Sequence, residues 1–112
     1  MRLFLSLLLV AACNSGEDDI HERDCDTSPL TYENYGAPYL LTWCVPCHSS
    51  ELTEADRQEA PVEANYDSHQ GVIDNLDGIL FWAVESEEMP PVGGPTDEGK
   101  DLFAEWIECG AL

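Results

Sequence analysis

Basic side chains are scarce in this chain of 112 residues. Four Lys and Arg stand against 23 Asp and Glu, which gives a formal net charge of −19 at pH 7. Nucleic-acid phosphates and anionic lipid headgroups bind to basic surfaces, so this deficit excludes both as expected partners. Long apolar runs are also lacking, because the run Leu3–Ala12 is well below the ~20 residues that cross a bilayer as a helix. The hydrophobic content of 44% is nevertheless too high for a disordered tail, and we expect one small folded domain.

The N-terminus has the organisation of an export signal. Arg2 precedes the apolar run, which ends in small residues, and this order predicts a signal peptide over residues 1–12. Val10-Ala11-Ala12-Cys13 resembles a bacterial lipobox, in which the cysteine is acylated and becomes the mature N-terminus. The alternative is an ordinary cleavage site that happens to lie beside a cysteine. Residues 13–29 are predicted to form an acidic tether.

The lipobox resemblance also implies a location. It places the mature protein on the periplasmic side of a bacterial membrane, in contact with that membrane through its lipid anchor only. Asn14 after the acylated cysteine is compatible with sorting to the outer membrane in Gram-negative lipoproteins. Export brings the chain into an oxidising compartment, where disulfide bonds persist.

Cys44-Val45-Pro46-Cys47-His48 has the pattern of a c-type haem attachment site. Two thiols three positions apart can form thioethers with the two vinyl groups of one haem. The adjacent imidazole can then donate a nitrogen to the iron. We therefore predict that Cys44 and Cys47 bind haem covalently and that His48 is an axial iron ligand.

Two other kinds of site share part of this motif. A zinc site would need a second pair of ligands, but the remaining cysteines are single and distant, and the other histidines are His21 and His69. Trp43–Cys47 also resembles the Trp-Cys-x-Pro-Cys motif of thioredoxin-like proteins. That fold needs β-branched strand runs before and after the motif, and the later valines and isoleucines occur only singly or as Val72-Ile73.

Met89 is the predicted sixth iron ligand, because it is the only methionine left after removal of the signal peptide. It begins the segment Met89–Pro95, whose prolines fix φ and stiffen the loop. With this loop, the haem motif and a closing helix that ends at Trp106–Gly110, residues 30–112 resemble small bacterial mono-haem cytochromes c of the class I type. The resemblance implies an all-α domain wrapped around one covalently bound haem c. It also implies that the Pro61 carbonyl accepts the hydrogen bond of the proximal imidazole.

Helices are predicted at four places along the domain. They cover residues 37–42, a segment from a cap at Asp67 or Ser68 towards Leu76, a mostly buried stretch from Ile79 to Val84 after a break at Asp77-Gly78, and a last helix capped by Thr96. The last helix presents an apolar face and is expected to stop at Gly110; the face comprises Leu102, Phe103, Trp106 and Ile107.

The five cysteines can each be given a role. If acylation uses Cys13 and haem uses Cys44 and Cys47, then Cys25 and Cys109 remain, and they can form one disulfide. Two free thiols are the alternative, because spacing alone does not show that the two residues come within bridging range.

The predicted function is a single-electron carrier and not an enzyme. Removal of residues 1–12 leaves three basic and 23 acidic residues, a formal charge of −20, so redox proteins with a basic docking patch are the expected partners. Two alternatives stay open. One is a haem c enzyme or sensor with an open distal site, for which His69, Arg57 and Arg23 are candidate groups, and the other is a thioredoxin-like thiol–disulfide module.

Overall fold

The computed structural model describes residues 23–91 and 93–112, and within these ranges the protein is helical without a strand. The predicted all-α class is therefore confirmed for this part of the chain. The elements are η1 (Tyr32–Gly36), α1 (Ala37–Trp43), η2 (Glu54–Arg57), α2 (His69–Asp74), α3 (Leu76–Ile79), η3 (Leu80–Glu85) and α4 (Asp97–Glu108). Of these, η1 and η3 are π-helical and η2 is a 3-10 helix.

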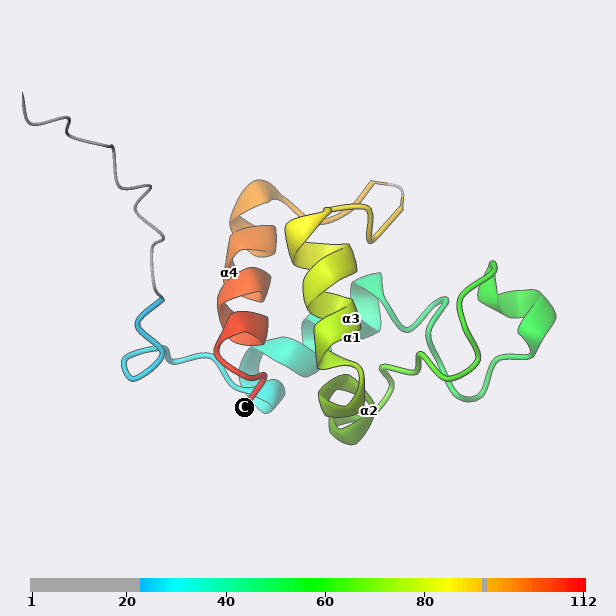
Figure 1. Cartoon of the computed structure of the whole chain (residues 1–112), viewed down its shortest axis with the longest axis horizontal. Helices are drawn as coiled ribbons and strands as arrows, with labels where there is room; N and C mark the ends of the chain where they lie inside the picture. The colour runs from blue at the N-terminus through cyan, green and yellow to red at the C-terminus, as the bar shows by residue number, and fades with distance from the viewer. Residues whose placement is uncertain (1–22, 92) are drawn as a thin grey trace, which may run out of the picture.

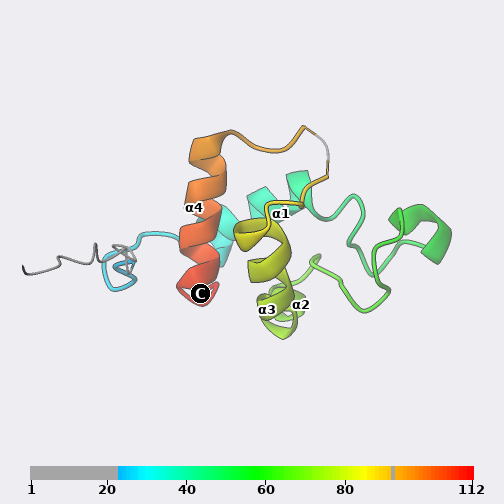
Figure 2. The ribbon, with the colours of Figure 1, turned by 45° about the horizontal axis from the view of Figure 1, so that its top comes forward.

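Two helical segments lie side by side in the fold (Figures 1 and 2). One segment is α4, and the other is α3 together with η3, which follows it directly. The segment between α1 and α2 extends away from these two helical segments as a separate lobe, which contains η2 (Figure 1). None of the helices in the described ranges is long and apolar enough to cross a membrane.

Local capping sets the helix ends at the predicted places. Ser68 and Thr96 each accept a hydrogen bond from the backbone N–H three residues on, which starts α2 and α4. At the end of α4, Gly110 has a φ of +92°, and the N–H of Ala111 donates to the carbonyl of Trp106. This is the usual glycine-dependent helix stop, so the caps and the stop at Gly110 are confirmed.

Two of the helical predictions are wrong in detail. The break before the third helix falls at Asn75 and not at Asp77-Gly78, because the Asn75 amide donates to the carbonyl four residues earlier and ends α2 there. The segment Ile79–Val84 is helical but not mostly buried, since Phe81 and Trp82 are 50% and 47% exposed. A helix that is apolar on all sides can turn only one side towards a single core.

Gly36 fits the first helices of the domain against α4. A Cβ added at Gly36 would lie 2.3 Å from a ring carbon of Trp106, whose indole is buried in the core. Three residues on, the ring of Tyr39 stacks on Phe103 with centroids 4.1 Å apart. These contacts fix the position of α1, and with it the turn that carries Cys44–His48. The buried core cluster consists of Leu40, Val72, Ile79, Phe103, Trp106, Ile107 and Ala111.

We expect Gly36→Ala to lower the free energy of unfolding by about 1–3 kcal/mol, because the methyl group must displace the Trp106 ring. Gly78→Ala is the matched control, since a Cβ there meets nothing within 4 Å. Urea unfolding of both variants measures the difference. Equal stabilities for the two variants would show that the Gly36–Trp106 contact is not close in solution.

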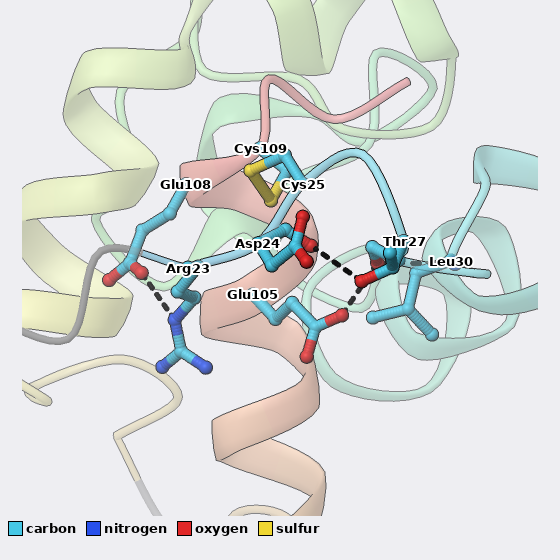
Figure 3. The surroundings of a disulfide bond; sticks show 9 residues. Arg23, Asp24, Cys25, Thr27, Leu30, Glu105, Glu108 and Cys109 are labelled. Carbon is cyan, nitrogen blue, oxygen red and sulfur yellow. Dashed lines mark hydrogen bonds and ion pairs between the residues drawn. A yellow bond between two sulfur atoms is a disulfide. The ribbon is translucent and has the colours of Figure 1, made fainter.

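A disulfide attaches the N-terminal segment to α4 (Figure 3). Cys25 and Cys109 are joined with a Cα–Cα distance of 5.4 Å, which is the pairing expected when the other three cysteines are used elsewhere. Arg23 of the same segment pairs with Glu108 of α4. The disulfide and this ion pair thus attach the described start of the chain, from Arg23 onward, to the end of α4.

Candidate functional site

The Cys44–His48 motif lies in the turns that follow α1. The N–H groups of Cys44 and Val45 both donate to the Leu40 carbonyl, at 2.9 and 2.8 Å, which attaches the start of the motif to the end of α1. The N–H groups of Cys47 and His48 then both donate to the Cys44 carbonyl, at 3.1 and 2.9 Å. These bonds wind the motif into one turn that carries two half-buried free thiols and the imidazole.

His48 presents one coordinating nitrogen. Its Nδ1 lies 2.9 Å from the carbonyl oxygen of Ala64. Because a carbonyl oxygen can only accept, Nδ1 carries the proton and Nε2 keeps the lone pair. The ring also stacks on Tyr66, with centroids 4.5 Å apart. A fixed tautomer and a fixed ring plane are what a metal-ligating histidine requires.

The imidazole is also kept neutral. Burial lowers the pKa of His48 below its ordinary value, against the opposing effect of the bond to Ala64. Neutral imidazole is the form that binds a metal ion, so the protonation state of His48 at pH 7 suits a ligand.

The acceptor of the His48 hydrogen bond is Ala64 and not Pro61, so that prediction is wrong. The Pro61 carbonyl instead accepts from Arg57 at 2.6 Å and from the N–H of Ala64 at 3.0 Å. This second bond closes a tight turn, and the turn presents the carbonyl of Ala64 to the imidazole.

The Cys44 thiol does not suit disulfide exchange. Burial raises the pKa of Cys44 to about 12, and the neighbouring Cys47 adds to the shift. A thioredoxin-like module needs a thiolate near neutral pH and a central sheet, whereas residues 23–91 and 93–112 contain no strand. The same residues also contain no group of three His, Cys, Asp or Glu side chains that could hold a metal ion, which weighs against a four-ligand zinc site.

Met89 lies in the loop between η3 and α4. Its N–H donates to the Trp82 carbonyl at 3.0 Å, which attaches the start of the loop to η3, and the residue is 40% exposed. The loop passes beside α1 in both views (Figures 1 and 2). Met89 and His48 thus come from separate loops, and their pairing around one iron stays a prediction.

The apolar surroundings of the motif fit a large apolar ring. Cys44 and Val45 pack against the same core cluster as Leu80, Ala83 and Val84 of η3. Four large apolar side chains of α1, of η3 and of the loop after η3 are exposed: Leu41, Phe81, Trp82 and Met89. Two free thiols and a lone-pair nitrogen on one turn are groups that could hold haem c.

The candidate distal groups of the open-site alternative are engaged elsewhere. His69 Nε2 lies 2.6 Å from the Ala111 carbonyl, and its ring stacks on Tyr32 with centroids 4.3 Å apart. This arrangement ties α2 to the C-terminus. Arg23 is paired with α4, and Arg57 lies on the Ala64 side of the imidazole.

The predicted signal peptide at 1–12, the acylated Cys13 and the tether up to residue 22 lie outside the described residues. Comparisons of the chain with protein-family models, with curated proteins and with solved structures found no match. A functional assignment therefore depends on the motif and on the geometry around His48.

Proposed function

We propose that this protein is a single-electron carrier that holds one covalent haem c with His/Met axial ligation and is tethered to a membrane through an acylated Cys13. The observation that carries the proposal is the fixed tautomer of His48, with Nδ1–H held by Ala64 and the lone pair on Nε2. Two free thiols on the same turn support it.

Each residue of the site has one role in this function. The thiols of Cys44 and Cys47 would each add across one vinyl group: the S–H bond and the π bond of the vinyl group break, and one C–S and one C–H bond form. His48 Nε2 and the Met89 sulfur would be the axial ligands. When bound, haem c supplies a one-electron ferric/ferrous couple. Ala64 keeps the His48 ring in one orientation, so little rearrangement accompanies a change of iron charge.

A potentiometric titration of the mature protein, followed in the visible spectrum, tests this function. We expect a reversible one-electron transition and a low-spin spectrum in both oxidation states. A high-spin ferrous form that binds carbon monoxide would instead support an enzyme or sensor with an open distal site.

Met89→Ala is expected to abolish the low-spin methionine spectrum and to lower the midpoint potential, because a thioether ligand favours ferrous iron. The measurement is a visible spectrum with potentiometry on the same sample. Val62→Ala is the control, since Val62 is also an exposed apolar residue but lies in the lobe between α1 and α2. An unchanged spectrum in Met89→Ala would exclude Met89 as the ligand.

The acidic surface is expected to select basic redox partners. Of the three cations in residues 23–91 and 93–112, Arg57 is buried, and Arg23 pairs with Asp101 and Glu108. The field of the remaining carboxylates should raise the encounter rate with a basic partner by roughly 10–10³-fold at low salt. This advantage should fade at physiological salt, where the Debye length is ~8 Å.

Stopped-flow oxidation by a basic and by an acidic redox protein, each over a salt series, measures this effect. We expect a steep fall of rate with salt for the basic partner and a rise for the acidic one. The same weak salt dependence for both would mean that the acidity serves solubility and not recognition.

A further inference from the structure

Arg57 is a buried cation whose partners are all backbone carbonyls. The residue is 2% exposed, and its guanidinium donates to the carbonyls of Ser49 at 2.6 Å, Ala60 at 3.3 Å, Pro61 at 2.6 Å and Ala64 at 3.0 Å. Within residues 23–91 and 93–112, no carboxylate lies within ion-pair distance of it. The four carbonyls accept from four of its five N–H groups but leave the positive charge without a counter-ion.

A buried charge without a counter-ion is costly, because the interior solvates it less well than water does. A neutral side chain or backbone hydrogen bonds could hold the Ser49–Tyr66 loop together without the free-energy cost of a buried charge. The cost of burying this charge indicates that the groups beside Arg57 require it.

Arg57 lies directly behind the partner of His48. The carbonyl oxygen of Ala64 accepts from Arg57 at 3.0 Å and from His48 Nδ1 at 2.9 Å, so both of its lone pairs are used. The guanidinium also holds Ser49, the residue after His48. Arg57 thus fixes both the carbonyl that orients the imidazole and the chain that carries it.

Further bonds close the same loop. The N–H of Tyr66 donates to the His48 carbonyl at 2.8 Å, and Asp67 accepts from Ser49 and Ser50. Since these bonds hold the loop ends together without Arg57, the base of the loop does not depend on the guanidinium alone. The turn between Pro61 and Ala64 presents the Ala64 carbonyl, and Arg57 adds a hydrogen bond that holds this carbonyl and a positive charge behind it.

We propose that Arg57 is a positioning residue that holds the Ala64 carbonyl against His48 and, as a fixed positive charge, favours the reduced state of an iron bound at Nε2. This inference rests on the proposed function. Ferric haem carries one more positive charge than ferrous haem, so a buried cation nearby destabilises the oxidised state. Because Arg57 is buried, salt screens this interaction much less than it screens an interaction at the surface.

The test compares Arg57→Met and Arg57→Lys in the full-length, haem-loaded protein. Arg57→Met removes the charge and all donors, whereas Arg57→Lys keeps the charge but cannot span several carbonyls. Two quantities are measured. One is the midpoint potential, and the other is the solvent-exchange rate of the His48 Nδ1–H proton by NMR of the ferrous protein.

We expect the equilibrium constant for reduction to fall about tenfold in Arg57→Met, which is 59 mV for one electron, and to stay near the wild-type value in Arg57→Lys. The Nδ1–H proton should exchange faster in both variants, because the Ala64 carbonyl has lost its anchor. The midpoint potential thus reports the charge at position 57, and the exchange rate reports whether the Ala64 carbonyl is held in place. Arg23→Met is the matched control, since Arg23 lies beside the disulfide in surface ion pairs, and it should change neither quantity.

Wild-type potential and exchange rate in a haem-loaded Arg57→Met protein would overturn the inference, even if its stability is lower. If that variant gives no folded protein, Arg57→Gln serves as the neutral variant with the same criteria. A wild-type chain without covalent haem would overturn the proposed function instead, so the two failures are distinguishable.

Discussion

Replacing Cys44 and Cys47 together by serine is expected to give a mature protein with no covalently bound haem. The two thiols are the only groups of the motif that can form thioethers, and both are free in the structure. The absorbance of haem in the purified protein, compared with its polypeptide mass, measures the loss.

The matched control replaces the other pair, Cys25 and Cys109, which are joined to each other and lie outside the motif. This control also removes two thiols, so it shows whether the loss of haem depends on position. Full haem content in the Cys44/Cys47 variant, or none in the control, would contradict the assignment of the two pairs.

The same control variant is expected to lose stability. The Cys25–Cys109 bond joins residues 84 apart in sequence, and a cross-link over such a loop stabilises the fold by roughly 4–5 kcal/mol, mainly by restricting the unfolded chain. Without it, the contacts of this segment to α4 include the Arg23–Glu108 ion pair, which is worth little at the surface.

Urea unfolding of the Cys25→Ser/Cys109→Ser variant, with and without a reductant, measures this loss. The wild-type protein should lose stability on reduction, and the variant should not respond. A variant as stable as the wild-type protein would show that the disulfide contributes little to the fold.

The helix ends could be predicted from the sequence because they depend on local chemistry. A hydroxyl at Ser68 or Thr96 reaches the N–H three residues on, and Gly110 adopts a positive φ without strain. The attachment motif is local in the same sense, since its residues are adjacent in the chain. Such features need no knowledge of distant segments.

The surroundings of His48 could not be predicted because they depend on contacts across the Ser49–Tyr66 loop. Pro61 was expected as the acceptor by resemblance, but the turn between Pro61 and Ala64 presents the later carbonyl. The stacking of Tyr66 on the imidazole was missed for the same reason.

The burial of Arg57 was missed as well, because a lone arginine in a polar segment is usually exposed. One feature of the sequence could have indicated it. Arg57 is the only cation between Arg23 and Lys100 in a strongly acidic chain, and a charge so isolated is a candidate for a specific role.

The most direct test of the central claim is acid–organic extraction of the mature protein, followed by mass spectrometry of the polypeptide. With Cys44 and Cys47 bound to haem c, the colour stays with the polypeptide, and the mass exceeds that of the mature chain and its lipid by one haem. Haem that passes into the organic solvent, or a polypeptide without the added mass, would contradict the claim.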